Sequence, residues 1–425
     1  MRYGHRRVAF CREFAEMRIL MVSEDLPTPS MGGLARHVLV LCGALREAGH
    51  QVDLMGNDDY PATAVSELRN FDGRFFPELR GQFSGWKEMT LGIFMPGKRS
   101  LLARCFARAI QRRAGEYDVI HYHGHLPNIA YYLPPTLNFI QTRHDQGSDC
   151  LTHTRFRRGE VCDDTVPEAC AGCRAWHPNR LQRRLSAMAV RRYRHEVETG
   201  FRRHKTVFVS DMLRRNLSRS FGEHRWGVTV HNFIDTAQVQ AARQLVRTSL
   251  TDPHLQVFIA AKLYPAKGVG ALLEYLQPHL GSRIAMDIAG DGEEEACLRE
   301  RYPQVTFHGW QSIEATLRLA ARSQVIVVPS LCEEACSSTV LEGLLLGKTV
   351  FALDRGGTPE LSIYASRPDQ LRLHKHLQAL AEALLNYTPS TENTVTPHAH
   401  TPADATHAAG RLLALYSLPP GPIAC

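Results

Sequence analysis

One stretch of this chain, from Val325 to Glu342, constrains its fold more than any other. Its first four residues are all β-branched, and a Pro-Ser pair follows them directly, which is typical of a buried parallel strand that ends in a turn. A helical pattern comes next and closes at Gly347, and a second apolar run begins at Thr349. Strand, helix and strand in this order predict a parallel α/β sheet, whose carboxyl edge faces a ligand crevice.

Two glutamates lie at that edge, Glu334 and Glu342, with seven residues between them. We expect Glu334 in the loop after the strand and Glu342 about two turns into the following helix. Carboxylates placed in this way would bind two different hydroxyl groups of one ligand. The pattern leaves one alternative open, in which one glutamate caps a helix and the other lies on a solvated helix surface.

The residues around these glutamates, PSLCEEACSSTVLEGLLLGKTVFALDRGGTPEL, resemble the signature of the retaining glycosyltransferases of family 4. That pattern has two Glu with seven residues between them, a Gly before the next strand and Gly-Gly-x-x-Glu after it, and the matching residues are Glu334, Glu342, Gly347, Gly356, Gly357 and Glu360. The chain departs from the pattern at Ala335-Cys336-Ser337, where a Gly-Phe-Gly-type loop is usual. The resemblance implies an α/β GT-B fold, in which two doubly wound Rossmann-like domains face a cleft.

The first domain of such a fold would begin at Met17, with the strand Arg18–Ser23 and a loop that contains Gly32 and Gly33. Glycines in a first strand-to-helix turn let backbone N–H groups approach a phosphate at the helix N-terminus. The loop is not a strict G-x-G-x-x-G, so the motif by itself is a weak signal. The resemblance implies that it faces the donor diphosphate or the acceptor.

Three histidines, His121, His123 and His125, alternate at the end of a later strand. They would share one face if the strand continued, but a turn near Gly124 disfavours a metal triad. The resemblance implies that His123 contacts the transferred sugar. A strand-end histidine that is hydrogen-bonded to nearby backbone is the alternative.

Two lysines, Lys262 and Lys267, stand near the start of the second α/β pattern. The family pattern has Arg at the first of these positions, whereas Lys267 and Gly268 agree with it. Two cations at a strand end and a helix start suit a diphosphate, although lysine lacks the bidentate fork of arginine. Surface lysines without a ligand are the alternative.

Composition limits the class of protein. A chain of 425 residues is long enough for two domains, each with its own core. It has no run of about 18 or more apolar residues, so we expect no membrane-spanning helix. The N-terminus lacks the apolar segment of a signal peptide, so the 11 cysteines are expected to be cytosolic thiols or metal ligands and not disulfides.

Four of these cysteines, Cys150, Cys162, Cys170 and Cys173, cluster in a stretch rich in Gly, Asp, Thr and Pro. The closing C-x-x-C has the tight bite of a tetrahedral zinc site, but the first two spacings are irregular. The segment is either a structural zinc site or an insertion loop with reduced thiols.

A basic region follows between Arg174 and Arg225, with arginines at 174, 180, 183, 184, 191, 192, 194, 202, 203, 214, 215, 219 and 225, and Lys205. A solvated helix face is the simplest interpretation. The more specific interpretation is that the region binds an anionic membrane surface or a phosphorylated acceptor. Nucleic acid ranks last, because no reader motif accompanies the charges.

We expect an N-terminal tail (1–16), a first Rossmann-like acceptor domain (17–235) with an insertion at about 146–180, a second sugar-nucleotide domain (236–388), and a flexible linker and tail (389–425). The Thr-, Pro- and His-rich composition of Glu392–Ala409 favours a linker. Among the strands that apolar runs predict are Val228–Asp235, Val257–Ala260, Ile284–Ala289 and Val305–Gly309.

The resemblance implies a metal-independent, retaining, hexosyltransferase-type enzyme that moves a sugar from a UDP- or GDP-sugar to a glycan, lipid-linked or small-molecule acceptor. It implies that Glu334 holds sugar hydroxyls and Glu342 the nucleotide ribose, while Lys262, Lys267 and the backbone near Gly356 meet the diphosphate. A sugar-nucleotide epimerase or hydrolase of the same fold and a non-catalytic binding protein are the alternatives. We expect the protein in the cytoplasm or at the cytoplasmic face of a membrane.

Overall fold

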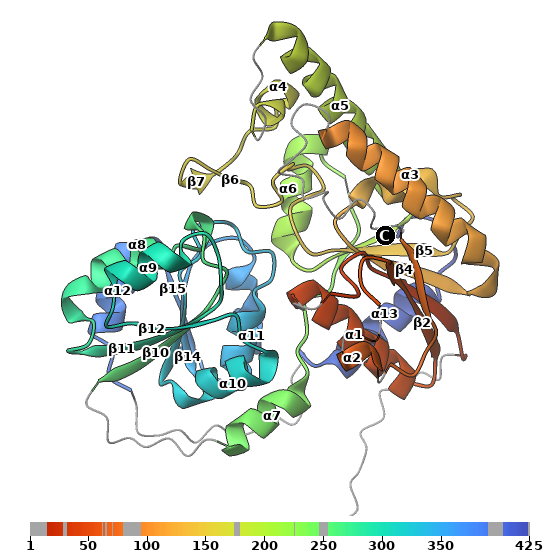
Figure 1. Ribbon diagram of the computed structural model, residues 1–425. Coiled ribbons are helices and arrows are strands. Elements are labelled where there is room, and N and C mark those ends of the chain that lie inside the picture. Colours follow the sequence, from red (N-terminus) through yellow and green to blue (C-terminus); the bar gives the residue numbers. More distant parts are fainter. Residues whose placement is uncertain are drawn as a thin grey trace, which may run out of the picture.

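The computed structural model describes residues 15–28, 32–61, 63, 66–69, 71–79, 95–173, 179–224, 226–245, 254–389 and 403–423. They form two α/β domains that stand side by side, each built on a parallel sheet (Figure 1). Most of the predicted tail at 1–16, together with Arg174 and Arg225 of the basic region, lies outside the described residues.

The first sheet has seven strands in the order β3-β2-β1-β4-β5-β8-β9, and all of its pairs are parallel. The strands are β1 (Arg18–Val22), β2 (Gln51–Asn57), β3 (Phe75–Leu79), β4 (Val119–His123), β5 (Phe139–Arg143), β8 (Lys205–Phe208) and β9 (Val228–Thr229). The last strand is much shorter than the predicted Val228–Asp235, since Asn232 already bonds to Cys336 of the second domain.

Helices cover both faces of this sheet, as its continuously buried strands require. They are α1 (Gly33–Glu47), α2 (Ser66–Arg69), α3 (Met95–Arg113), α5 (Arg180–Arg203) and α6 (Asp211–Phe221), with the 3₁₀ turns η4 (Ala114–Glu116) and η5 (Pro127–Tyr132). One core joins α1 to the sheet, and a second core joins α3 and η5 to its other face.

The second sheet has six strands in the order β12-β11-β10-β13-β14-β15 and is also parallel. The strands are β10 (Leu255–Ala260), β11 (Ile284–Ala289), β12 (Thr306–Gly309), β13 (Val325–Val328), β14 (Thr349–Leu353) and β15 (Leu371–His374). The helices are α7 (Thr236–Leu245), α8 (Val269–Leu276), α9 (Glu295–Arg301), α10 (Ile313–Arg322), α11 (Ser338–Leu345) and α12 (Leu377–Leu385), with η6 (Pro265–Lys267), η7 (Gln277–His279) and η8 (Thr358–Tyr364).

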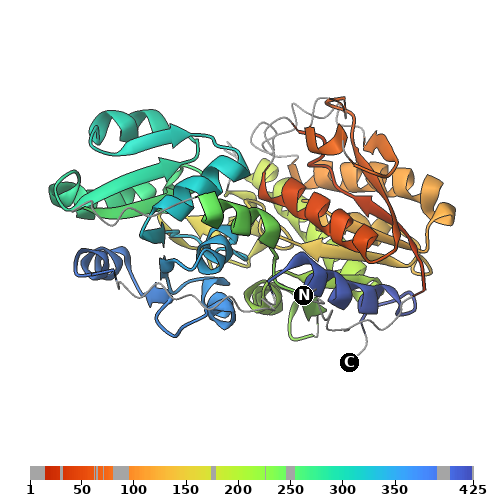
Figure 2. The ribbon, with the colours of Figure 1, turned by 90° about the horizontal axis from the view of Figure 1, so that it is seen from below.

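The prediction of a flexible tail over 389–425 is wrong for its last part. Residues Ala405–Tyr416 form helix α13, which returns to the first domain and lies against it in both views (Figures 1 and 2). Its apolar face packs with α1 in the first core through Ala408, Leu412, Leu413 and Tyr416. Asp404 caps the helix by accepting a hydrogen bond from the backbone N–H of His407.

The cysteine-bearing insertion is folded. A short antiparallel pair, β6 (Phe156–Arg157) with β7 (Glu160–Val161), leads to helix α4 (Pro167–Ala171). Helix α4 packs against α5, which extends with it to one end of the molecule (Figure 1). The insertion is thus attached to the first domain along the middle of α5, where Arg191 pairs with Glu168 and Arg194 bonds to Cys170 Sγ, and through a pair of Arg219 of α6 with Asp163.

The two domains contact each other directly. One apolar cluster runs from α5 and α6 of the first domain to α7, α10 and α11 of the second. Glu360 of the second domain accepts hydrogen bonds of 2.7 Å from the backbone N–H groups of Asp211 and Met212. These N–H groups open helix α6, so a carboxylate of one domain satisfies the helix end of the other.

Candidate functional site

A cleft between the domains encloses a cavity of about 420 Å³. Its lining comes from both domains, and it includes Gly33, Arg36, His37, His125, His144 and Asp145 from the first and Lys262, Lys267, Ser330, Glu334, Cys336 and Glu342 from the second. The carboxyl ends of β10 and β13 open into it, as expected for a ligand crevice of parallel sheets.

Lys267 and Glu334 form the ionic centre of this cavity. The lysine Nζ lies 2.5 Å from Glu334 Oε1, and the Ser330 hydroxyl donates a hydrogen bond of 2.5 Å to the same oxygen. Burial disfavours both charges, but the attraction between the two groups outweighs it. The pKa of Lys267 is therefore raised and the pKa of Glu334 lowered, so both groups are charged at neutral pH.

Glu342 lies about one turn into helix α11, not two, because Ser337 caps this helix by accepting a hydrogen bond from Val340 N. Its side chain is 7% exposed and pairs with Arg36 of α1, whose Nη1 lies 3.3 Å from Glu342 Oε1. Burial raises the pKa of Glu342, and Arg36 opposes this shift.

Lys262 also faces the cavity, but its Nζ pairs with Asp291 at 2.9 Å and its side chain is 61% exposed. Gly32 and Gly33 lie at the start of α1 with open space where a side chain would stand. That space is what the predicted approach of a ligand to the backbone requires.

The two glycines after β14, Gly356 and Gly357, support the loop of Glu334 instead of lining the cavity. A Cβ at Gly356, where φ is +65°, would lie 2.7 Å from Glu334 N, and a Cβ at Gly357 would lie 2.2 Å from Ala335 O. The Gly357 N–H donates a hydrogen bond to Glu334 O. This N–H is therefore occupied within the protein.

The histidines predicted on one strand have separate partners. His121 bonds to Tyr416 and Thr142, while Nδ1 of His123 lies 3.0 Å from Nε2 of His144. Ring nitrogens of His37, His123 and His144 lie within 4.8 Å of one another. Burial lowers the pKa of all three, that of His37 to about 3, so they are neutral imidazoles. His37 and His144 line the cavity, whereas the fully buried His123 lies behind them.

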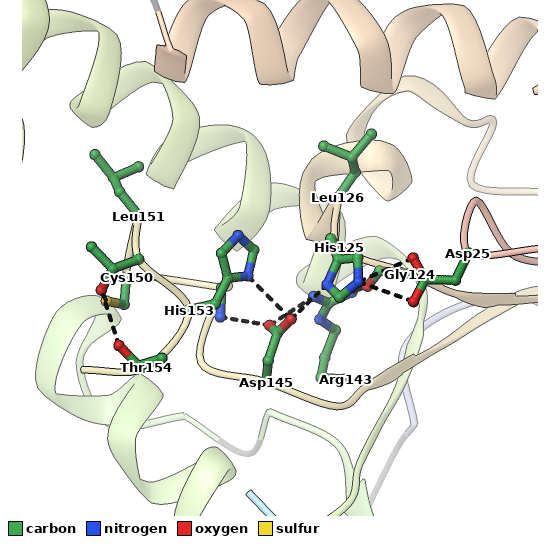
Figure 3. Close-up of polar contacts among 12 residues, drawn as sticks. Asp25, Gly124, His125, Leu126, Arg143, Asp145, Cys150, Leu151, His153 and Thr154 are labelled. Carbon is green, nitrogen blue, oxygen red and sulfur yellow. Dashed lines mark hydrogen bonds and ion pairs between the residues drawn. The ribbon is translucent and has the colours of Figure 1, made fainter. Parts of the chain in front are cut away.

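His125 is the cationic histidine of the cleft (Figure 3). Its Nδ1 lies 2.8 Å from Asp145 Oδ2, and its Nε2 lies 3.3 Å from Asp25. Burial opposes the charge of His125, but these two carboxylates outweigh it and raise its pKa well above the usual value. His153 approaches Asp145 from the other side, with Nδ1 at 3.1 Å from Oδ2.

The groups His125, Asp145 and His153 also lie close enough to share a metal ion. Arg99 Nη2 lies 2.7 Å from His153 Nε2, and a guanidinium only donates, so that nitrogen is the acceptor. The proton of neutral His153 is then on Nδ1, toward Asp145. This tautomer favours a charged hydrogen-bond network over metal ligation.

The four predicted zinc ligands, Cys150, Cys162, Cys170 and Cys173, line a separate cavity of about 20 Å³ in the insertion. None of the cysteines that the structure describes is part of a disulfide. The four sulfurs are not among the sets of three ligand atoms that the described residues gather within 4.8 Å.

Sequence reasoning missed Arg36, Ser330, His37 and the network around His125. Arg36 and His37 follow the glycine loop by only a few residues, so helix periodicity from Gly33 was a usable signal. The network of Asp25, His125, Asp145 and His153 had no such signal, because its members meet across neighbouring strand ends.

Comparison with known proteins agrees with this architecture. A family model described as Glycosyltransferase Family 4 matches residues 31–238, and one described as Glycosyl transferases group 1 matches residues 254–388. The phosphatidyl-myo-inositol mannosyltransferase of Mycolicibacterium smegmatis is 26% identical over an alignment of 358 residues, and the match covers 80% of this chain and 76% of that protein.

Two solved structures show the same fold over 95% of the chain. HepE of Anabaena, in complex with UDP and glucose, has a TM-score of 0.58 at 17% identity and covers 95% of this chain and 100% of its own. The catalytic domain of starch synthase IV from Arabidopsis thaliana, bound to ADP and acarbose, has a TM-score of 0.58 at 15% identity over 95% and 99%. The two family models account for both domains, and the chain is therefore a glycosyltransferase of family 4 with the GT-B fold.

Proposed function

We propose that the cleft transfers a sugar from a nucleotide sugar to an acceptor hydroxyl with retention of the anomeric configuration. The observation that carries this proposal is the Lys267–Glu334 pair, which is charged, partly buried and lines the same cavity as a buried carboxylate, Glu342. In this arrangement Lys267 meets the diphosphate, Glu334 the sugar hydroxyls and Glu342 the ribose. His144, which lines the cavity, would contact the sugar, and His123 would position His144 from behind.

In the reaction the bond between C1 of the sugar and the β-phosphate oxygen breaks, and the diphosphate leaves with the electron pair. The acceptor oxygen bonds to C1 from the same face, and its proton passes to the departing phosphate. Lys267 and Lys262 stabilise the charge that grows on the diphosphate, which is the kind of electrostatic effect that accelerates catalysis most. With two lysines in this role, we propose transfer without a divalent metal ion.

Two comparisons support a nucleotide-sugar donor. HepE was solved with UDP-glucose and with UDP and glucose, and starch synthase IV was solved with ADP. We propose a UDP- or GDP-sugar for this chain. The loop at Cys336 lines the cavity where the family usually has a glycine-rich loop, so it is the place where donor preference would differ.

We also propose that the acceptor is lipid-linked and that the enzyme acts at the cytoplasmic face of an anionic membrane. The mannosyltransferase relative carries phosphatidyl-myo-inositol in its name. In this chain the first half of α5 exposes Leu181, Leu185 and Met188, at 66%, 45% and 61%. Arg180, Arg183 and Arg184 lie beside them and pair with no carboxylate among the described residues.

Apolar side chains beside unpaired arginines match an anionic lipid surface, because anionic head groups would pair with the arginines and acyl chains would contact the apolar side chains. No helix among the described residues is long and apolar enough to cross a bilayer. Zinc, which we propose only as a structural ion of the cysteine insertion, takes no part in the transfer.

The proposal is tested in two steps. A panel of UDP- and GDP-sugars is first screened by thermal shift, since a ligand that binds the folded state raises its stability with ln(1 + [L]/Kd). The stabilising donor is then incubated with lipid and glycan acceptors in the presence of a chelator, and the anomeric configuration of the product is read by NMR. Release of sugar without any acceptor product would support the hydrolase alternative, and an inverted product would contradict retention.

A further inference from the structure

The cysteine cluster of the insertion has the form of an ion site that the transfer chemistry does not use. Cys150, Cys162, Cys170 and Cys173 come from three loops and the end of α4, and they line one cavity of about 20 Å³. A cavity of this size accepts a single water or ion. The backbone N–H of Cys173 bonds to Cys170 O at 3.1 Å, which gives the tight C-x-x-C turn that brings two sulfurs to one metal.

A buried arginine beside the cluster lacks a carboxylate. Arg194 of α5 is 8% exposed, and its Nη2 donates a hydrogen bond of 3.2 Å to Cys170 Sγ. Its other partners are two carbonyl oxygens, of Asp149 and Thr165, and its Nε is buried without a partner. No ion pair among the described residues includes Arg194, although a buried guanidinium without an anion is strongly destabilising.

Neighbouring arginines do have carboxylates. The pairs around the insertion are Arg155 with Asp149, Arg157 with Asp164, Arg191 with Glu168, and Arg219 with Asp163. The carboxylates that could approach Arg194 are therefore engaged elsewhere. The group beside it that gains a negative charge on binding a metal ion is the Cys170 thiol.

We infer that the four cysteines bind one Zn²⁺ as thiolates and that Arg194 is the cation that offsets part of their charge. Binding releases four thiol protons and leaves a tetrahedral centre of net charge −2, with Zn–S distances of about 2.3 Å. The three loops draw inward around the cavity to reach these distances. The assignment concerns the insertion alone and stands whether or not the transfer proposed for the cleft is right.

The first test is metal content, measured on the full-length protein purified without a His-tag. Elemental analysis is expected to find stoichiometric zinc in the parent and in Cys297→Ser, an exposed thiol outside the insertion. The double variant Cys170→Ser/Cys173→Ser is expected to have lost it. Because this variant could fail to fold, the parent is also stripped with a chelator and reloaded with Co²⁺. Four thiolates give an intense sulfur-to-cobalt charge-transfer band.

A parent chain without zinc that also shows no such band would overturn the inference.

The second test isolates Arg194. Arg194→Met is expected to lose zinc to a competing chelator at a concentration about tenfold or more below that needed for the parent. Arg191→Met, on the same helix but paired with Glu168, is the matched control and is expected to behave as the parent. Equal zinc retention in all three proteins would overturn the role of Arg194.

Discussion

Arg36 and Glu342 form an ion pair across the cleft at 3.3 Å, although they lie 306 residues apart in the chain. The arginine belongs to α1 of the first domain, and the glutamate to α11 of the second. Under the proposed function the ribose hydroxyls of the donor need the same carboxylate. Donor binding and this contact between domains therefore compete for one side chain.

The burial of Glu342 predicts that nucleotide affinity depends on pH. Burial raises the pKa of Glu342, so the carboxylate that accepts the ribose hydroxyls is lost as the pH falls toward that raised value. Arg36→Met removes the charge that opposes the shift, and the loss should then begin at a higher pH. Nucleotide affinity measured by calorimetry between about pH 5 and 8 checks this, with Arg46→Met, at the far end of α1, as the control. Identical profiles for the parent and Arg36→Met would contradict it.

Lys267→Ala should reduce turnover by about 10²-fold or more, because the variant lacks the charge that stabilises the leaving diphosphate. Steady-state rates at saturating donor, with circular dichroism to verify folding, make the comparison. Lys375→Ala changes an exposed lysine in the second domain and should leave the rate unchanged. A folded Lys267→Ala enzyme with parental turnover would remove Lys267 from the mechanism.

Glu360→Ala should destabilise the contact between the domains by about 1–3 kcal/mol, because two backbone N–H groups of α6 lose their acceptor. Chemical denaturation measures this, with the exposed Glu300→Ala as control. His231 and these hydrogen bonds outweigh burial and lower the pKa of Glu360. The stabilisation is therefore fully present above the usual carboxyl pKa and is lost as the pH falls from there through the lowered pKa of Glu360. An unchanged free energy of unfolding at neutral pH would be the contrary result.

Attachment to anionic vesicles should depend on the first half of α5. Each Arg near an anionic surface contributes roughly 1 kcal/mol, and salt screens exposed charges over about 8 Å at physiological ionic strength. Replacing Arg180, Arg183 and Arg184 by Glu should therefore abolish co-sedimentation with anionic liposomes at low salt. Leu181→Gln/Met188→Gln should weaken it without altering its salt dependence. Equal partitioning of the parent to neutral and anionic vesicles would exclude this mode of binding.

Much of the fold follows from short apolar runs. The predicted strands Ile284–Ala289 and Val325–Val328 coincide with β11 and β13, because strands buried on both faces admit almost only apolar residues. Helix α13 was missed, since the Thr-, Pro- and His-rich residues before it favour a linker. Its apolar face gains a partner only when the chain returns to α1, a contact of long sequence separation.

The candidate site likewise divides into residues that local motifs predict and residues that depend on contacts of long sequence separation. Glu334, Glu342 and Lys267 stand in local motifs, and the structure brings them to one cavity as expected. The role of Arg36 depends on how the domains face each other. The charge of His125 depends on Asp25 and Asp145, which lie on other strand ends, so no local pattern reveals it.

The return of the chain at α13 also determines how the domains are joined. Ile234, where the chain leaves the first domain, donates its N–H to Ala403 O at 2.9 Å and forms a β-bridge with Asp404, where the chain comes back. The outgoing and returning crossings are thus tied to each other, and we expect them to act as a single hinge. Opening of the cleft would then be a swing about that line, because a sideways slip of one domain past the other would break the bridge.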